Sequence, residues 1–326
     1  MKLVVLIPAF NEEKTIGKVI QEIPKDIEGI DEIKILVVDD GSTDNTAEIA
    51  KKAGADYILK HKQNLGLAVA FRDGLEKALK LGGDIIVNTD ADFQYNQKEI
   101  PKLIKPILEG KTEIVLTDRQ VLKLDHMPFS KKYGNLLATF VTRIISGYPV
   151  KDAQSGFRAF SKEAAVRLNV LGDYTYVQEV IIQAVFKKLK IVQIPCEFRK
   201  RAGDGQSRLI SSLGNYAKKA GSIIIRTYIR YKPLKFFLTL GILVMIPGFA
   251  LCSRFLIPYF VGQGGQHLQS LILGTMLLIM GFQIIVMALI ADTINANRII
   301  EEEILYKLKK KELGKISKEI KEERNG

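Results

Sequence analysis

The sequence predicts an α/β protein with a mostly parallel sheet, helices on both faces of that sheet, and two membrane-spanning helices near its end. Short apolar runs alternate with helical stretches through roughly the first two hundred residues, a pattern typical of such sheets. Two longer runs, 236–253 and 255–291, contain no Asp, Glu, Lys or Arg. Each is long enough to cross a bilayer. Two buried core helices of a soluble protein are the alternative interpretation.

Each predicted strand is followed by a predicted helix. The first helix is expected to open at Asn11, and the second to be capped by Ser42 or Thr43 and closed by Gly54. Beyond residue 120 the pattern is less regular, with helices expected near 133–147 and 174–189 and a strand leading into a basic loop. The predicted strands are KLVVLIP at 2–8, KILVVDD at 34–40, ADYILKH at 55–61, DIIVNTDAD at 84–92 and EIVLTDR at 113–119, and the helices between them are 11–23, 42–54, 65–82 and 100–110.

Charge placement predicts how the chain lies in a membrane. The net charge is +12, and the stretch 199–235 is rich in Lys and Arg with a single acid, Asp204. The polar turn 262–267 has no Lys or Arg, so the positive-inside rule places both chain ends in the cytoplasm. No N-terminal signal peptide is visible. The expected organisation is a catalytic domain at 1–211, a basic amphipathic helix at 212–233, a membrane part at 234–292 with spans at about 234–260 and 268–291, and a charged C-terminal helix at 293–326.

Several functional classes are disfavoured by composition. The basic segment before the spans suits anionic headgroups, and no motif for nucleic-acid recognition accompanies it. Cys196 and Cys252 are the two cysteines, too few for a disulfide framework or a zinc site. The three histidines, 61, 126 and 267, are scattered, which argues against a histidine metal site.

Polar side chains gather where the predicted strands end. Glu12, Asp39, Asp90, Asp92 and the pair Asp118-Arg119 all follow apolar runs. In parallel sheets the carboxyl ends of the strands meet at one edge, and ligands bind there. The sequence therefore predicts a binding site at this edge.

The chemistry of that edge favours a nucleotide held through a metal. A dinucleotide enzyme needs a glycine turn after its first strand, but PAFNEE at 8–13 has none, and a Walker A loop is also absent. Asp90 and Asp92 are expected on the same side of an extended segment, and Gln94 continues that side. Oxygen ligands of this kind suit Mg²⁺ or Mn²⁺ shared with a diphosphate. On neighbouring strand ends, Asp39 and Glu12 can accept hydrogen bonds from a base and a ribose.

These motifs resemble a known family. LIPAFNEE, VVDDGSTDNT and NTDADFQ resemble the inverting GT-A glycosyltransferases of family 2. DAQSGFRAF and RAGDGQSR, with the two spans, are similar to dolichyl-phosphate mannose synthase and related polyprenyl-phosphate glycosyltransferases. The resemblance covers about residues 1–230 closely. It implies an enzyme that moves a sugar from a nucleotide sugar to a polyprenyl phosphate at the cytoplasmic membrane face.

The resemblance also implies roles for individual residues. Arg119 would face the donor phosphates, and Asp92, Asp152 and Arg119 would form the catalytic group, with Glu179 as an acidic partner. The family often has tyrosine at the position of Phe10. It usually has lysine at the position of Arg208. The implied nucleoside pocket is Pro8, Phe10, Glu12, Val37 and Asp39; the diphosphate and metal site is Asp90, Ala91, Asp92 and Gln94; the mobile-loop clamp is Arg201 and Arg208; and the acceptor-phosphate site is Lys131, Asn135 and Arg158.

Charge also limits the mechanism. A phosphate monoester has a second pKa of about 6, so the acceptor is already ionised near neutral pH and needs little help from a general base. The expected work is to stabilise the leaving group and to bring two anions together. A processive polysaccharide synthase would carry a Q-x-x-R-W motif, and this chain has no tryptophan. A non-catalytic membrane scaffold is the other alternative. The sugar, the choice between GDP and UDP, and a possible homo-oligomer stay open.

Overall fold

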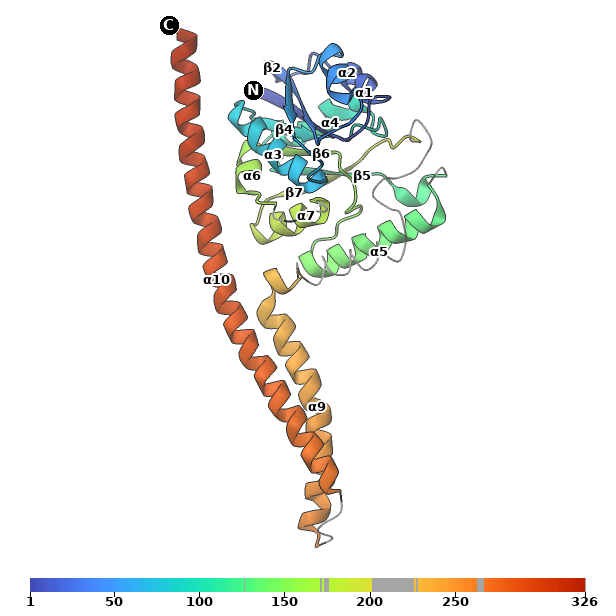
Figure 1. Ribbon diagram of the computed structural model, residues 1–326, viewed down its shortest axis with the longest axis vertical. Coiled ribbons are helices and arrows are strands. Elements are labelled where there is room, and N and C mark those ends of the chain that lie inside the picture. Colours follow the sequence, from blue (N-terminus) through green and yellow to red (C-terminus); the bar gives the residue numbers. More distant parts are fainter. Residues whose placement is uncertain are drawn as a thin grey trace. The chain divides into compact units, whose positions relative to one another are not determined.

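The protein divides into two units. The computed structural model describes residues 1–125, 127–170, 172, 176–200, 226, 228–262 and 267–325, with side chains up to Ile316. One unit comprises Met1–Gly221 with Tyr306–Gly326, and the other Ser222–Leu305. The first holds the sheet, and the second holds most of two long apolar helices (Figure 1).

The sheet has seven strands in the order β3-β2-β1-β4-β6-β5-β7. All neighbouring pairs are parallel except those that β6 makes with β4 and β5. The predicted mostly parallel sheet is therefore confirmed, with one antiparallel strand that the sequence pattern did not indicate. The strands are β1 (Lys2–Ala9), β2 (Glu32–Asp39), β3 (Tyr57–Lys60), β4 (Ile85–Asn88), β5 (Ile114–Asp118), β6 (Arg158–Ser161) and β7 (Ile191–Pro195).

Helices cover both faces of the sheet. Along β1, Leu3, Val5 and Ile7 pack into one core with α1 and α4, whereas Val4 and Leu6 pack into a second core with α3, α6 and α7. This alternation is expected of a strand buried on both faces. The helices of this unit are α1 (Ile16–Glu22), α2 (Thr46–Lys52), α3 (Leu67–Lys80), α4 (Ile100–Leu108), α5 (Phe129–Ser146), α6 (Lys162–Arg167) and α7 (Val177–Phe186), with 3₁₀ turns η1 (Gln97–Glu99) and η2 (Val121–Lys123).

Strand register brings the predicted strand ends together. Ala9 pairs with Asp39 and Leu6 with Asn88, so β1, β2 and β4 end at the same edge. Strand β5 runs in the same direction, because antiparallel β6 separates it from β4. The same reversal makes β6 begin at this edge. The segment that precedes β6, residues 152–157, therefore arrives beside the ends of β4 and β5.

Local details differ from the sequence prediction. Helix α1 begins at Ile16 rather than at Asn11, which takes a left-handed φ of 53° and ties two loops together instead of capping a helix. Helix α2 begins at Thr46, after the turn that contains Ser42 and Thr43. The N-cap residue is Asn45, and the Asp44 carboxylate before it accepts the Thr46 N–H at 3.0 Å.

Two long apolar helices make up most of the second unit. Helix α9 (Pro233–Phe260) and helix α10 (Leu268–Asn325) have 18-residue windows of mean hydropathy 2.2 and 2.4, long and apolar enough to cross a membrane. Only 17% of each window is buried, unlike core helices of a soluble protein. Helix α10 continues without a break through 293–325, where a separate helix was expected. Residues 212–225, most of the predicted amphipathic helix, lie outside the described residues.

Glycines let α9 and α10 approach closely. A Cβ on Gly274 would lie 2.7 Å from Cys252 Sγ and 2.9 Å from the Gly248 carbonyl oxygen. A Cβ on Gly281 would lie 2.9 Å from the Gly241 carbonyl oxygen. Small residues at such contacts allow helix backbones to pack in a bilayer.

We expect Gly274→Ala to destabilise the helical hairpin by about 1–3 kcal/mol, the usual cost of overpacking. The added methyl would have to displace backbone on the facing helix. Thermal unfolding in detergent micelles measures the effect. Gly314→Ala is the matched control, because Gly314 lies on the same helix with no atom within 4 Å of its Cβ position. Equal melting temperatures for both variants would contradict this packing.

Candidate functional site

The loops after β1 and β2 interlock at the carboxyl edge of the sheet. The Asn11 N–H donates to Ser42 Oγ at 2.9 Å, and the Ser42 N–H donates to Asp39 Oδ1 at 2.9 Å. The Glu12 N–H donates to Thr46 Oγ1 at 2.8 Å. These bonds hold PAFNEE and DDGST as one rigid corner and fix Asp39 within it.

Asp39 is the most distinctive group of this corner. It is fully buried, and Oδ2 makes no hydrogen bond to any residue that the structure describes. The Lys60 ammonium stands 3.8 Å from that oxygen. A buried carboxylate oxygen without a hydrogen bond is costly. Asp39 therefore offers a rigid acceptor that fits an N–H donor of a ligand.

The other predicted pocket residues differ in exposure. Phe10 and Glu12 are partly exposed beside Asp39, and Glu12 Oε2 accepts the Thr15 hydroxyl at 3.0 Å. Pro8 is buried within β1. Val37 is fully buried and packs into the core shared with α1 and α4. Its side chain therefore supports the corner from within the core.

A histidine that sequence reasoning set aside holds the neighbouring loop. His61 Nδ1 lies 2.7 Å from Asp40 Oδ1, and the N–H groups of Leu65 and Gly66 donate to the same carboxylate at 2.9 Å each. The Asp40 carboxylate therefore fastens residues 61–66 over the end of β2. A Cβ on Gly41 would lie 2.4 Å from the Gln63 backbone, so only glycine fits beneath this loop.

The segment Asp90–Gln94 is a turn rather than the expected extended strand. Strand β4 ends at Asn88, and Phe93 has a left-handed φ of 62°. Asp92 Oδ1 accepts the Gln94 N–H at 3.1 Å, and Gln94 Nε2 donates to the Arg199 carbonyl at 3.3 Å. The rule of alternating side chains therefore does not apply here. Asp90, Asp92 and Gln94 are therefore brought together by the turn and not by the alternation of an extended strand.

Gly156 supports this turn from the strand β6 side. A Cβ on Gly156 would lie 2.7 Å from Asp90 Oδ1, so the carboxylate packs directly on the glycine. The Gly156 carbonyl accepts from Asn88 Nδ2 at 2.8 Å, and the Gly156 N–H donates to the Tyr95 hydroxyl at 3.0 Å. Burial raises the pKa of Tyr95, so its hydroxyl stays protonated. Backbone held on both sides cannot easily shift, and Asp90 is thereby positioned.

The residues at this turn fit a hard divalent cation. Asp90, Asp92 and Gln94 supply only oxygen donors, which suit Mg²⁺ or Mn²⁺. No group of three His, Cys, Asp or Glu suited to a metal occurs among the described residues. An ion here would thus need further oxygens from a ligand such as a diphosphate. Burial raises the pKa of the Cys196 thiol to about 12, so this thiol is protonated at neutral pH.

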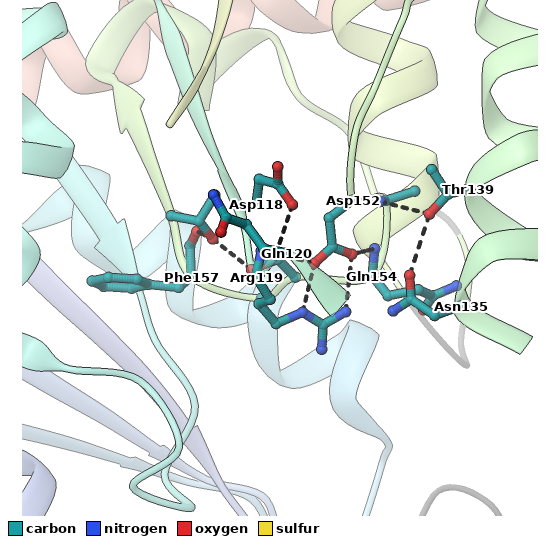
Figure 2. A network of polar contacts seen from close by, with 12 residues as sticks. Asp118, Arg119, Gln120, Asn135, Thr139, Asp152, Gln154 and Phe157 are labelled. Atoms are coloured by element: carbon teal, nitrogen blue, oxygen red, sulfur yellow. Dashed lines mark hydrogen bonds and ion pairs between the residues drawn. The ribbon is translucent and has the colours of Figure 1, made fainter. Parts of the chain in front are cut away.

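Arg119 and Asp152 form a buried ion pair at the end of β5. Arg119 Nε donates to Asp152 Oδ2 at 2.6 Å and Nη2 to Oδ1 at 2.9 Å, and the Gln154 N–H also donates to this carboxylate (Figure 2). Burial favours the neutral acid, but the Arg119 charge outweighs it and lowers the pKa of Asp152 below its ordinary value. Asp152 is thus an ionised partner that orients Arg119. Nη1 of Arg119 makes no hydrogen bond within the described residues.

A hydrogen-bond chain connects this pair to α5. The Ala153 N–H donates to Thr139 Oγ1 at 3.1 Å, and the Thr139 hydroxyl donates to Asn135 Oδ1 at 3.4 Å (Figure 2). Asn135 and Lys131, both predicted to hold the acceptor phosphate, are half-buried on this helix. Helix α5 therefore carries part of the predicted acceptor site and braces the Asp152 loop.

Arg158 has a different role from the predicted contact with the acceptor phosphate. It is fully buried, and its guanidinium donates to the carbonyls of Ser155, Val177 and Ala153 at 2.7, 2.6 and 3.2 Å. All three nitrogens are engaged by backbone, so Arg158 holds residues 153–155 in place. We therefore leave it out of the acceptor site.

The structure describes the predicted acidic residue Glu179 but not the two arginines of the predicted clamp. Glu179 accepts the Gly172 N–H at 3.0 Å and the Gln183 amide at 3.2 Å, which ties it to its own helix and the preceding loop. Arg201 and Arg208 lie outside the described residues. Arg199, just before them, pairs with Glu22 at 3.0 Å and lies over the Phe93 ring.

The fold and this edge define a glycosyltransferase of the GT-A type. The chain belongs to the family described as glycosyl transferase family 2, whose model matches residues 4–168. The structure is similar to that of glucosyl-3-phosphoglycerate synthase from Mycobacterium tuberculosis in complex with Mn²⁺, UDP and glucosyl-3-phosphoglycerate. The TM-score is 0.51 and the identity 27%, and the match covers 70% of this chain and 78% of that one.

Two curated relatives are similar to about 60% of the chain. The chain is 37% identical over 214 residues to the UDP-N-acetylglucosamine–dolichyl-phosphate N-acetylglucosaminyltransferase of Methanococcus voltae, covering 58% of this chain and 82% of that protein. It is 34% identical over 218 residues to the dolichol-phosphate mannosyltransferase of Pyrococcus furiosus, covering 64% and 59%.

Proposed function

We propose that the protein transfers a hexose or N-acetylhexosamine from a nucleotide sugar to dolichyl or another polyprenyl phosphate, with inversion at the anomeric carbon. The donors to consider are GDP-mannose, UDP-glucose and UDP-N-acetylglucosamine. The observation that carries the proposal is the buried Asp39 oxygen, which has no hydrogen bond within the described residues and lies at the sheet edge where β4 ends before the Asp90–Gln94 turn. Uracil and guanine both present ring N–H groups that fit such an acceptor. The names of the relatives point to the lipid phosphate acceptor.

Residues of this chain would orient the two anions. The acceptor phosphate is nucleophilic without a base, because its second pKa is about 6. Asp152 does not act as a base, since both its oxygens accept hydrogen bonds. It instead aims Arg119, whose Nη1 can donate to a donor phosphate oxygen. Lys131 and Asn135 on α5 would receive the acceptor phosphate. Attack from the face opposite the leaving diphosphate inverts the sugar.

A divalent ion fits this proposal. Asp90, Asp92 and Gln94 would hold Mg²⁺ or Mn²⁺, which when bound supplies positive charge that stabilises the departing diphosphate. Structures of the mycobacterial relative were obtained with either ion. Asp39 and the interlocked corner bind the nucleoside, and Arg201 and Arg208 would close on the diphosphate.

The lipid acceptor implies work at a membrane. We infer that α9 and α10 cross the bilayer, with the catalytic domain and both termini in the cytoplasm, because the Lys and Arg residues flank the spans on that side. The expected partners are then the bilayer, the nucleotide sugar and the polyprenyl phosphate. Nucleic acid is not an expected partner. Two spans make a small membrane footprint, which is the reason to consider a homo-oligomer through the C-terminal part.

A donor panel tests the function. Membranes containing the protein receive polyprenyl phosphate and, separately, labelled GDP-mannose, UDP-glucose or UDP-N-acetylglucosamine, with Mn²⁺ or with EDTA. We expect one donor to give a labelled lipid, and EDTA to abolish it. Asp92→Ala should lower the rate by at least about 100-fold. Asp26→Asn, an exposed carboxylate between α1 and β2, should leave the rate unchanged.

The outcomes separate the alternatives. Labelled lipid that survives both EDTA and Asp92→Ala would refute the metal assignment. Labelled polymer without labelled lipid would indicate a polysaccharide synthase. No product from any donor would favour the scaffold interpretation.

A further inference from the structure

A short segment that follows β7 is anchored on the Asp90–Gln94 turn. Phe198 forms an isolated antiparallel bridge with Tyr95. The Arg199 N–H donates to the Gln94 carbonyl at 2.7 Å, and Gln94 Nε2 donates back to the Arg199 carbonyl at 3.3 Å. Two residues that are far apart in the chain are thus joined by a reciprocal pair of hydrogen bonds.

This pairing fixes the orientation of the Gln94 side-chain amide. A carbonyl oxygen can only accept a hydrogen bond, so the Arg199 carbonyl must meet the NH₂ group of the amide and not its oxygen. Gln94 Oε1, on the other branch of the amide, takes no hydrogen bond within the described residues. That oxygen is the atom with which Gln94 can bind a hard cation. The position of the Arg199 backbone therefore decides whether Gln94 offers the site an oxygen or an N–H.

The Arg199 side chain is itself held on two sides. Its Nη1 donates to both carboxylate oxygens of Glu22, the last residue of α1, at 3.0 Å each. Its guanidinium carbon lies 5.1 Å from the centroid of the Phe93 ring, within the range of a cation–π contact. The two side chains of the ion pair are 25% and 14% exposed, so salt screens this pair less than it screens an exposed one.

Phe93 needs support of this kind. Its left-handed φ of 62° is unfavourable for a residue other than glycine, and such a conformation persists only where the surroundings hold it. The Phe93 side chain packs against the core shared with α1 and α4, and the Arg199 guanidinium lies over its ring. Because Phe93 stands between Asp92 and Gln94, its conformation sets the directions in which these two side chains leave the turn.

We propose that Arg199 is a positioning residue for the divalent ion of this site. Held by Glu22, it keeps Phe93 in the left-handed conformation and Gln94 Oε1 directed to the ion. Glu22 also offsets the Arg199 charge, which would otherwise repel a cation. Arg199 acts through Phe93 and Gln94 and does not itself bind the ion. This inference rests on the proposed function, in which the Asp90–Gln94 turn binds Mg²⁺ or Mn²⁺.

Mn²⁺ binding without catalysis tests this role. The full-length protein in detergent micelles is titrated with Mn²⁺ in the presence of UDP or, separately, GDP, and free Mn²⁺ is followed by its electron paramagnetic resonance signal. We expect Arg199→Gln to weaken Mn²⁺ binding by about 10-fold. Glu22→Gln should weaken it to a similar degree. The double variant should be about as weak as either single variant, because all three lose the same contact.

Arg167→Gln is the matched control. Arg167 also pairs with a glutamate, Glu163, at 2.7 Å, and its guanidinium carbon lies 4.5 Å from the centroid of the Tyr306 ring. Helix α6, which carries Arg167, follows the end of β6 at the opposite edge of the sheet. Both variants should lower the melting temperature, but only Arg199→Gln should weaken Mn²⁺ binding. Arg199→Lys, which keeps a charge beside Glu22, should recover most of the lost affinity.

The outcomes separate this role from the proposed function. Equal Mn²⁺ affinities of the parent and Arg199→Gln would overturn the positioning role and leave the proposed function standing. A parent protein that binds no Mn²⁺ with either nucleotide would refute the metal site of the proposed function, and this inference with it. If Arg199→Gln does not fold, Glu22→Gln decides the question by the same titration, because glutamine at position 22 keeps an oxygen for the Gln97 N–H that Glu22 accepts at 3.1 Å.

Discussion

Replacing Asp152 by asparagine is expected to destabilise the catalytic domain and to abolish sugar transfer. The change leaves the Arg119 guanidinium buried without a counter-ion, at a cost of about 3–5 kcal/mol. Chemical unfolding and the transfer assay measure the two effects. Asp118→Asn is the control, because Asp118 is the neighbouring carboxylate and is partly exposed, and within the described part of the chain its side chain accepts only the Gln120 N–H. It should change stability by less than about 1 kcal/mol.

A second variant separates structure from chemistry. In Asp152→Asn with Arg119→Gln the buried charge is removed, so stability should return in part while transfer stays absent. Such coupling is what a double-mutant cycle isolates. A double variant that regains transfer would show the pair to be only structural. A single variant as stable as the parent would contradict the burial of the pair.

The same pair predicts a pH dependence. Because the pKa of Asp152 is lowered in the folded state, its contribution to stability is complete above the unfolded value of about 3.9. That contribution is lost as the pH falls through the lower, folded value. The stability gap between parent and Asp152→Asn should therefore narrow in strong acid. A gap that stays constant in that range would contradict this assignment.

Gly156→Ala is expected to weaken metal-dependent transfer. The new methyl would meet Asp90 Oδ1 at 2.7 Å, and the glycine backbone is held by Asn88 and Tyr95. Asp90 must therefore move, and displacing a ligand support typically costs about 10–100-fold in metal affinity or activity. The Mn²⁺ concentration for half-maximal transfer measures this. Gly314→Ala, far along α10, is the control. An unchanged Mn²⁺ dependence would exclude Asp90 as a metal ligand.

Much of the site could be predicted because parallel strands end at one edge. Asp39, Asp90 and Asp118 each follow an apolar run, and the register of β1, β2 and β4 brings the first two together. Asp118 joins them because β5 runs in the same direction. The local sequence pattern was sufficient to predict this edge, because a helix between two strands makes the strands run in the same direction.

Other features could not be predicted because they depend on distant partners. Strand β6 has four residues and forms only between β4 and β5. Arg158 resembled a phosphate ligand, but three backbone carbonyls satisfy it. His61 looked isolated until Asp40 was found beside it. The Asp90–Gln94 turn depends on the left-handed Phe93, which the strand pattern concealed.

By itself the sequence determined the class of fold, the edge that carries the site, the motifs of family 2 and the two apolar spans. These follow from periodicity, composition and short motifs, which are local properties of the chain. Only the tertiary structure decided that Asp152 serves Arg119, that Gly156 supports Asp90, and that Arg199 is hydrogen-bonded to Gln94. Those facts depend on which side chains pack against which, and such contacts join residues far apart in the chain.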